Sequence, residues 1–133
     1  MTNQKIRIYT DQVAEPADKL WSNCQRVGDV VYVAGLTARA ADGVTIEGPG
    51  EYEQAKVIFS KIKAYMLAAG GQMDDIVKMT IFVTNMANNK EVWRAREEFF
   101  TGDFPTCALV EVSGLANSNI LVEINATAHL GCA

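Results

Sequence analysis

The segment from Glu51 to Ala69 constrains the fold most strongly, because its sequence has the repeat of an amphipathic helix. Its apolar side chains recur at steps of three and four residues, at Ala55, Ile58, Phe59, Ile62, Tyr65 and Met66. Gly70-Gly71 follows and is expected to end the helix, as glycine commonly does. The apolar stripe of such a helix has to be buried, so the rest of the chain must supply an apolar surface.

Short runs of β-favouring residues supply that surface. Strands are expected over residues 5–9, 29–35, 74–85, 107–112 and 120–130, with a further possible strand around the Asp42-Gly43 hairpin signal. A second helix is expected over 88–101, before Phe104-Pro105. This order predicts an α+β domain, a mixed sheet with two helices packed on one face. The other face carries apolar residues as well, which predicts burial against further copies of the chain.

Composition excludes several classes of protein. The chain has 133 residues, enough for a single domain over 1–133, and its 49% hydrophobic and 21% charged residues are typical of a globular protein. A net charge of -4 argues against a nucleic-acid partner. No apolar run is long enough for a membrane span, and the N-terminus lacks the apolar core of a signal peptide, so a cytoplasmic location is expected.

Metal chemistry is not expected either. The cysteines Cys24, Cys107 and Cys132 are odd in number and widely spaced, and His129 is the single histidine. This pattern fits neither a disulfide framework nor a zinc site, so no metal is predicted.

Two residues in the closing strands could carry chemistry. Glu123 lies between apolar neighbours in ILVEINATA and is either an outward-facing surface residue or a partly buried acid with a raised pKa. Cys107 follows Pro105 at the entry to a strand, and is either a small apolar residue of the core or a residue that lines a ligand site. Glu111 fits an ordinary surface position.

Two further candidates lie earlier in the chain. Trp21 precedes small polar residues, so it either lines a pocket or caps the core as a surface aromatic. Gly35 ends a strand and either offers an open backbone amide or simply terminates the strand.

The chain as a whole resembles the YjgF/RidA family of enamine/imine deaminases. The segments LWSNC and VYVAGLT are similar to the family's PYSQA and SGQ patterns, and LAAGGQMDDIVKMTIFVTNM resembles the block that follows the first family helix. The family's PAR segment corresponds to FPTC, and its EIEAIA strand corresponds to VEINATA. The order and spacing of these segments make the resemblance specific.

The resemblance implies a chorismate-mutase-like fold, a homotrimer with a ligand cleft at each subunit interface, and a reaction without cofactors. It places Glu123 on the glutamate that positions the attacking water, and Gly35 on the glycine of the SGQ turn, with Thr37 just beyond. Trp21 replaces a tyrosine near the pocket, and Trp93 lies about where many members have asparagine. Cys107 replaces the arginine that holds the substrate carboxylate.

Two functions remain open at this point. The first is a small-molecule hydrolase of the enamine/imine deaminase type, with Glu123 orienting water and Cys107 lining the site or acting as a nucleophile. Because the arginine is absent and tryptophans are present, its substrate is expected to differ from the usual 2-imino acids. The second is a non-catalytic member of the family that binds a small ligand.

Overall fold

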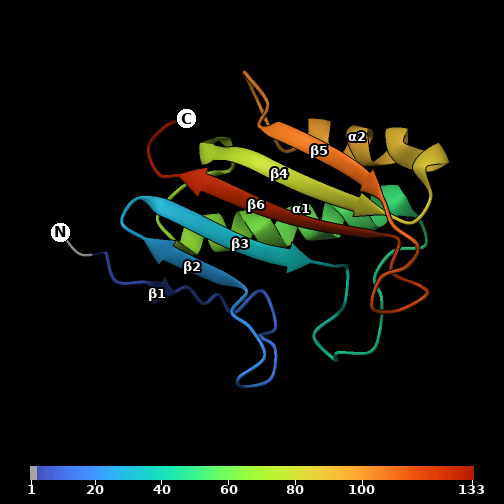
Figure 1. The fold of residues 1–133 in the computed structure, drawn as a ribbon, viewed down its shortest axis with the longest axis horizontal. Coiled ribbons are helices and arrows are strands. Elements are labelled where there is room, and N and C mark those ends of the chain that lie inside the picture. The colour runs from blue at the N-terminus through green and yellow to red at the C-terminus, as the bar shows by residue number, and fades with distance from the viewer. Residues whose placement is uncertain (1–2) are drawn as a thin grey trace.

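Two helices cover one face of a six-stranded mixed sheet (Figure 1). The computed structural model describes residues 3–133. The strands are β1 (Ile6–Arg7), β2 (Cys24–Val27), β3 (Val30–Leu36), β4 (Ile76–Val83), β5 (Thr106–Glu111) and β6 (Val122–His129), and the helices are α1 (Glu51–Ala68) and α2 (Asn89–Glu97). In the order β1-β2-β3-β6-β4-β5, only the β4–β5 pair is parallel. The predicted fold class is confirmed.

The core lies between α1 and the strands, as the helical repeat predicted. The apolar stripe of α1 is buried, and Phe59 and Tyr65 are among its largest fully buried side chains. Alternate residues of β4 and β6 meet this stripe, because successive side chains of a strand point to opposite faces. Ile81 and Ile124 are register partners on this face, and both are fully buried.

A buried glutamine joins α1 to the chain on either side of it. The side-chain amide of Gln54 donates to the carbonyl oxygens of Gly48 (3.1 Å) and Asn119 (2.9 Å), and its oxygen accepts from the backbone nitrogen of Leu121 (2.9 Å). Gln54 is 1% exposed, so these bonds replace water for three backbone groups. The loop that leads into β6 is thereby fixed to the start of α1.

The second helix is shorter than the sequence indicates. It ends at Glu97 rather than at Thr101, and a 3-10 turn over Met86–Asn88 precedes it. Thr101 bonds through both its backbone nitrogen and its hydroxyl to the carboxylate of Asp74, which draws the chain away from the helix. Phe100 then packs edge-on against Phe59 in the core.

The strand predicted over 74–85 begins later than expected. A 3-10 turn covers Met73–Asp75, and Gln72 caps it in a capping box with Asp75. The Asp42-Gly43 turn is confirmed, since Asp42 accepts bonds from the backbone of Val44 and Thr45, but the flanking residues form one isolated bridge rather than a strand.

Strand β2 was missed in the sequence. Its four residues mix polar and apolar side chains and give no clear alternation. The available signal was Gly28-Asp29, a two-residue hairpin turn between β2 and β3 in which Gly28 has a φ of 57°.

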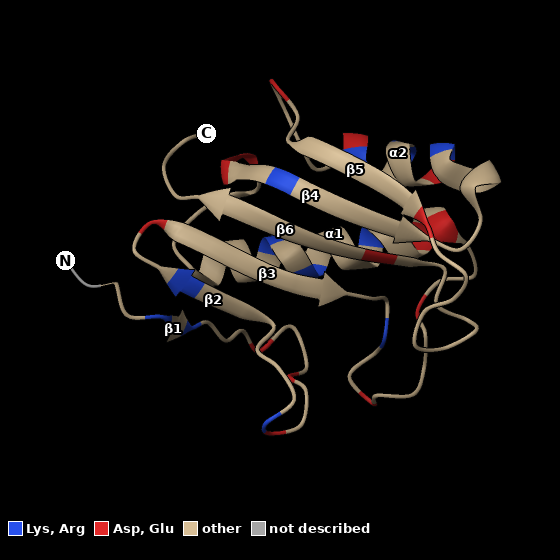
Figure 2. Ribbon diagram, in the orientation of Figure 1, with Lys and Arg blue, Asp and Glu red and all other residues tan. Residues whose placement is uncertain are grey.

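The face of the sheet away from the helices contains few charges. Along β3, β4, β5 and β6 the acidic and basic residues on this face are Lys78 and Glu123 (Figure 2), whereas Glu111 is the partner of the buried Val83 and lies on the helical face. Tyr32 on β3 is 51% exposed and Val110 on β5 is 41% exposed, so apolar surface faces outward in the single chain.

The Gln54 contacts make a testable contribution to stability. Gln54→Leu keeps the side-chain volume but leaves two carbonyls and one amide without partners, so we expect the free energy of unfolding to fall by about 2–4 kcal/mol. Urea titration monitored by circular dichroism measures it. Lys63→Ala, at an exposed position of the same helix, is expected to change it by less than about 0.5 kcal/mol. Equal effects of the two substitutions would contradict the role given to Gln54.

Candidate functional site

Glu123 and Gly35 are in contact on the face of the sheet away from the helices. Glu123 on β6 is the register partner of Phe82 on β4, and it alternates with the buried Val122 and Ile124. A Cβ built on Gly35 would lie 3.0 Å from Cδ of Glu123 and closer still to its Oε2. A glycine at position 35 therefore lets the carboxylate lie directly against the β3 backbone.

The carboxylate of Glu123 is partly removed from water. Burial raises the pKa of Glu123 above its ordinary value, and no basic group among residues 3–133 offsets this effect. The structure thus favours the second of the two sequence interpretations, a partly buried acid. An acid with a raised pKa takes up and releases a proton closer to neutral pH, which suits proton transfer.

Three of the predicted residues line one groove. Trp21, Gly35 and Thr37 border a hollow of about 930 Å³. Its walls are the N-terminal segment 12–21, the loop that follows β3, and the outer surface of α1. Gly35 belongs to both features, because it borders the groove and also lies against the carboxylate of Glu123.

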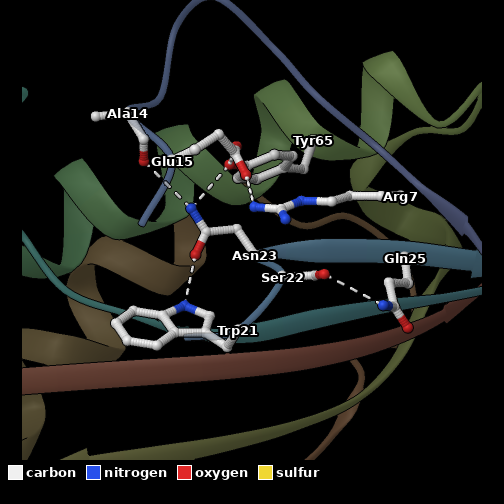
Figure 3. Close-up of polar contacts among 8 residues, drawn as sticks. All are labelled: Arg7, Ala14, Glu15, Trp21, Ser22, Asn23, Gln25 and Tyr65. Atoms are coloured by element: carbon white, nitrogen blue, oxygen red, sulfur yellow. Dashed lines mark hydrogen bonds and ion pairs between the residues drawn. The ribbon is translucent and has the colours of Figure 1, made fainter. Parts of the chain in front are cut away.

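The indole of Trp21 is held by a buried asparagine (Figure 3). Trp21 Nε1 donates to Oδ1 of Asn23 at 2.9 Å, and Nδ2 of Asn23 donates to the hydroxyl of Tyr65 (3.0 Å) and the carbonyl of Ala14 (3.2 Å). Trp21 is 54% exposed while Asn23 is 5% exposed, so a fixed polar group orients an accessible ring. The sequence indicated Asn23 as one of the small polar residues beside Trp21, but it did not show that Asn23 is the residue that holds the indole.

The same network continues to the N-terminal strand. The Tyr65 hydroxyl donates to Glu15, and Glu15 forms an ion pair with Arg7 at 2.8 Å (Figure 3). Burial raises the pKa of Tyr65, so the hydroxyl keeps its proton and serves as the donor. These bonds attach the N-terminal wall of the groove to α1.

Lys61 closes the groove on the helical side. Its Nζ donates to the carbonyl oxygens of Thr37 (2.7 Å) and Arg39 (2.6 Å). Burial lowers the pKa of Lys61. The sequence indicated no role for Lys61, because it lies off the apolar stripe of α1. Its role in holding the loop after β3 depends on the path of that loop, which only the structure shows.

Cys107 lies elsewhere, on the edge strand β5, where it is exposed rather than part of the core. Arg96 of α2 donates from Nη1 to its sulfur at 3.4 Å. Burial raises the pKa of the Cys107 thiol, and Arg96 opposes this effect without reversing it. The thiol therefore keeps its proton at neutral pH, which does not favour the predicted role as a nucleophile.

Trp93 is on the outer side of α2 and is 41% exposed. It precedes Arg96 by three residues, so the two side chains leave neighbouring positions of the helix. Trp93 is not among the residues that border the groove at Trp21.

Glu123 and Cys107 lie on opposite faces of one sheet. Cys107 is the register partner of Met79, which is buried under the helices. Glu123 is the partner of Phe82, three residues further along β4, and an odd separation in a strand means opposite faces. One chain therefore does not bring Glu123 and Cys107 together.

Residues 3–133 hold no group of three or more His, Cys, Asp or Glu side chains arranged to bind a metal ion. None of the helices in this part of the chain has both the length and the apolar character that crossing a membrane requires.

Comparison with known proteins decides the family. The family model described as Endoribonuclease L-PSP matches residues 12–130. The chain belongs to this family, which includes the YjgF/RidA proteins. The resemblance seen in the sequence is confirmed.

Individual relatives agree with this assignment. The 2-iminobutanoate/2-iminopropanoate deaminase of Dermatophagoides farinae is 32% identical over 89% of this chain and 91% of its own. A protein of unknown function from Pseudomonas aeruginosa has a TM-score of 0.85 and 38% identity, over 98% of this chain and 95% of the other. A Rid family protein from Yersinia pestis has a TM-score of 0.85 and 31% identity, over 96% of this chain and 100% of its own.

The contact between Gly35 and Glu123 can be tested by stability. Gly35→Ala forces the carboxylate away from β3, and because the displaced atoms end a flexible side chain, we expect it to lower the free energy of unfolding by about 1 kcal/mol. In a Glu123→Ala background the same substitution should cost less than about 0.5 kcal/mol, because the clash is gone. Denaturant titration of the four proteins gives the coupling.

Gly114→Ala is the matched control, since a Cβ at Gly114 meets no atom within 4 Å. An equal cost of Gly35→Ala in both backgrounds would show that Glu123 is not what the new methyl group meets.

Proposed function

We propose that the protein is a cofactor-independent hydrolase of the enamine/imine deaminase type. The observation that carries this proposal is Glu123, a partly buried carboxylate with a raised pKa that lies against the backbone of Gly35. Membership of the family and a relative named 2-iminobutanoate/2-iminopropanoate deaminase support it.

The chemistry requires one base and one water molecule. The carboxylate of Glu123 accepts a proton from water while the water oxygen attacks the imine carbon. Glu123 returns this proton to the imine nitrogen, which gives a neutral carbinolamine. Glu123 then takes the hydroxyl proton of the carbinolamine and passes it to the same nitrogen, the carbon–nitrogen bond breaks, and the products are a carbonyl compound and ammonia, with the carboxylate regenerated.

We further propose that the site is completed between copies of the chain, in a homotrimer. Glu123 lies on the face of the sheet away from the helices, and Cys107 lies on the helical face. Both side chains can contact one small ligand only if they belong to different copies. The exposed apolar residues Tyr32 and Val110 are the kind of surface that such contacts bury.

A non-catalytic ligand-binding protein is the second candidate. Cys107 favours it, because a neutral thiol stands where the resemblance implies a substrate-binding arginine. This candidate predicts that a ligand raises the thermal unfolding temperature without being converted.

An RNA substrate is less well supported, although the family description names an endoribonuclease. The net charge of -4 and the three charged residues along β3, β4, β5 and β6 provide no basic surface for a phosphate backbone.

Ammonia release from 2-iminobutanoate generated in the cuvette tests the proposal. We expect the native protein to accelerate release and Glu123→Gln to lower kcat by about 100-fold or more, because an amide cannot accept the proton. Asp29→Asn, in the exposed β2–β3 turn, should leave kcat unchanged.

The pH dependence of the rate gives a further test. Burial raises the pKa of Glu123, so the carboxylate becomes protonated at a higher pH than an ordinary glutamate does. The rate of ammonia release should therefore fall on acidification at a correspondingly higher pH.

Unchanged turnover in Glu123→Gln would contradict the mechanism. Ligand-induced stabilisation of the native protein with no ammonia release would favour the second candidate.

A further inference from the structure

Two cations border the groove at Trp21 without a carboxylate partner. Arg39 comes from the loop after β3, and Lys61 comes from the outer surface of α1. Neither takes part in the ion pairs found in residues 3–133, whose cations are Arg7, Arg26, Lys56 and Arg94. Both Arg39 and Lys61 are half-buried, so water and salt screen their charges less than those of fully exposed residues.

The two cations are also close enough to act on each other. Nζ of Lys61 donates to the backbone carbonyl of Arg39 at 2.6 Å. Burial is the main cause that lowers the pKa of Lys61, and the positive charge of Arg39 lowers it further. Glu47, which borders the groove as well, acts in the opposite sense, but it is exposed and is not a member of the ion pairs found in residues 3–133. An anion bound between the ammonium and the guanidinium would offset their repulsion.

Each cation keeps hydrogen-bond donors for a ligand. Lys61 uses two of its three N–H groups, on the carbonyl oxygens of Thr37 and Arg39. Arg39 uses Nη1 on the carbonyl oxygen of Gly43, at 2.9 Å, which leaves most of its guanidinium donors for another acceptor. All three acceptors belong to the loop that forms one wall of the groove, so these bonds also hold the two cations in place.

The N-terminal wall of the groove supplies an apolar surface. Trp21 and Leu20 both border the hollow, and both are exposed in the single chain. Asn23 accepts a hydrogen bond from the indole nitrogen of Trp21, so the ring is oriented before a ligand binds (Figure 3). A flat apolar group can stack on such a ring.

The size of the groove limits what it would hold. Small-molecule sites usually have volumes of about 300–1,000 Å³. The groove, at about 930 Å³, is near the upper end of this range and is much larger than a four-carbon acid. Two cations opposed by the exposed Glu47 favour a ligand with a single negative charge.

We propose that this groove is a separate binding site for a flat aromatic monoanion, whose ring lies against Trp21 and whose carboxylate lies between Arg39 and Lys61. The inference goes beyond the proposed function and does not depend on it, because Glu123 is not among the residues that border the groove. Gly35 is the point at which the groove and the Glu123 contact meet.

A matched pair of probes tests the inference without requiring turnover. Isothermal titration calorimetry would compare 2-naphthoate with 2-naphthamide, which has nearly the same shape but no charge. We expect the native protein to bind the acid at least about tenfold more tightly than the amide. Arg39→Gln and Lys61→Gln should each weaken binding of the acid by about 5- to 30-fold and change that of the amide by less than about twofold. Trp21→Ala should weaken binding of both probes by about 5- to 20-fold, because it removes the stacking surface.

The two charge variants cover each other. Lys61→Gln also weakens the bonds that hold the loop after β3, whereas Arg39→Gln leaves those bonds in place, because Lys61 donates to the backbone of Arg39 and not to its side chain. Lys63→Gln is the matched control, since it removes a positive charge from an exposed position of the same helix. It should change the affinity for 2-naphthoate by less than about twofold.

Glu123→Gln separates this site from the one proposed for hydrolysis, and it should also change the affinity for 2-naphthoate by less than about twofold. Tight binding of the acid that is lost in Arg39→Gln and kept in Glu123→Gln would support the inference, whether or not the protein hydrolyses 2-iminobutanoate. Equal affinity for acid and amide, unchanged affinity in both charge variants, or loss of binding in Glu123→Gln would overturn it. Absence of saturable binding of 2-naphthoate to the native protein would overturn it as well.

Discussion

Burial of the α1 stripe against one face of the sheet determines where every candidate residue lies. Because strand side chains alternate, fixing Met79, Ile81 and Ile124 under the helices fixes their neighbours on the other face. Glu123 then lies on the face away from the helices, and Cys107 lies on the helical face beside Arg96. A shift of one residue in the pairing of β6 with β4 would turn Glu123 toward the helices and bury its carboxylate in the core.

The two groups of residues have complementary chemistry. Glu123 offers a base with a raised pKa that lies against the backbone of Gly35, and Gly35 also borders the groove at Trp21. The group around Cys107 offers a cation and a second exposed indole. The separation of Glu123 and Cys107 on opposite faces of one chain is the physical reason for expecting an assembly.

Much of the fold could be predicted from the sequence, because the apolar residues of most helices and strands recur with the period of that element. The stripe of α1 and the apolar runs of β3, β4 and β6 repeat with the periods of their elements, and Gly70-Gly71 ends α1 as expected. The end of α2 could not be predicted, since it depends on the bonds between Thr101 and the distant Asp74. Strand β2 was missed because four residues are too few to show a period.

The candidate site was predictable only in part, since its residues come from distant segments. Glu123 was recognisable as a carboxylate in an apolar strand, and Gly35 as the end of another, but their contact is a property of the register. Arg96 could not be placed, because a residue on a helix gives no sign of which strand residue it touches. The sequence around Cys107 therefore shows the loss of a cation, while the structure shows where one lies.

Mixed assemblies test the central claim most directly, that one site takes Glu123 from one copy and the surface at Cys107 from another. A Glu123→Gln protein, which lacks the base, and a Cys107→Trp protein, whose bulky side chain fills the site from β5, would each be inactive alone on 2-iminobutanoate and would be combined by unfolding and joint refolding. If the residues act across an interface, random mixing of equal amounts gives about a quarter of the sites both intact residues, and activity should return to that level. If both residues act within one chain, every site keeps one defect, and a mixture with no more activity than the separate variants would contradict the account.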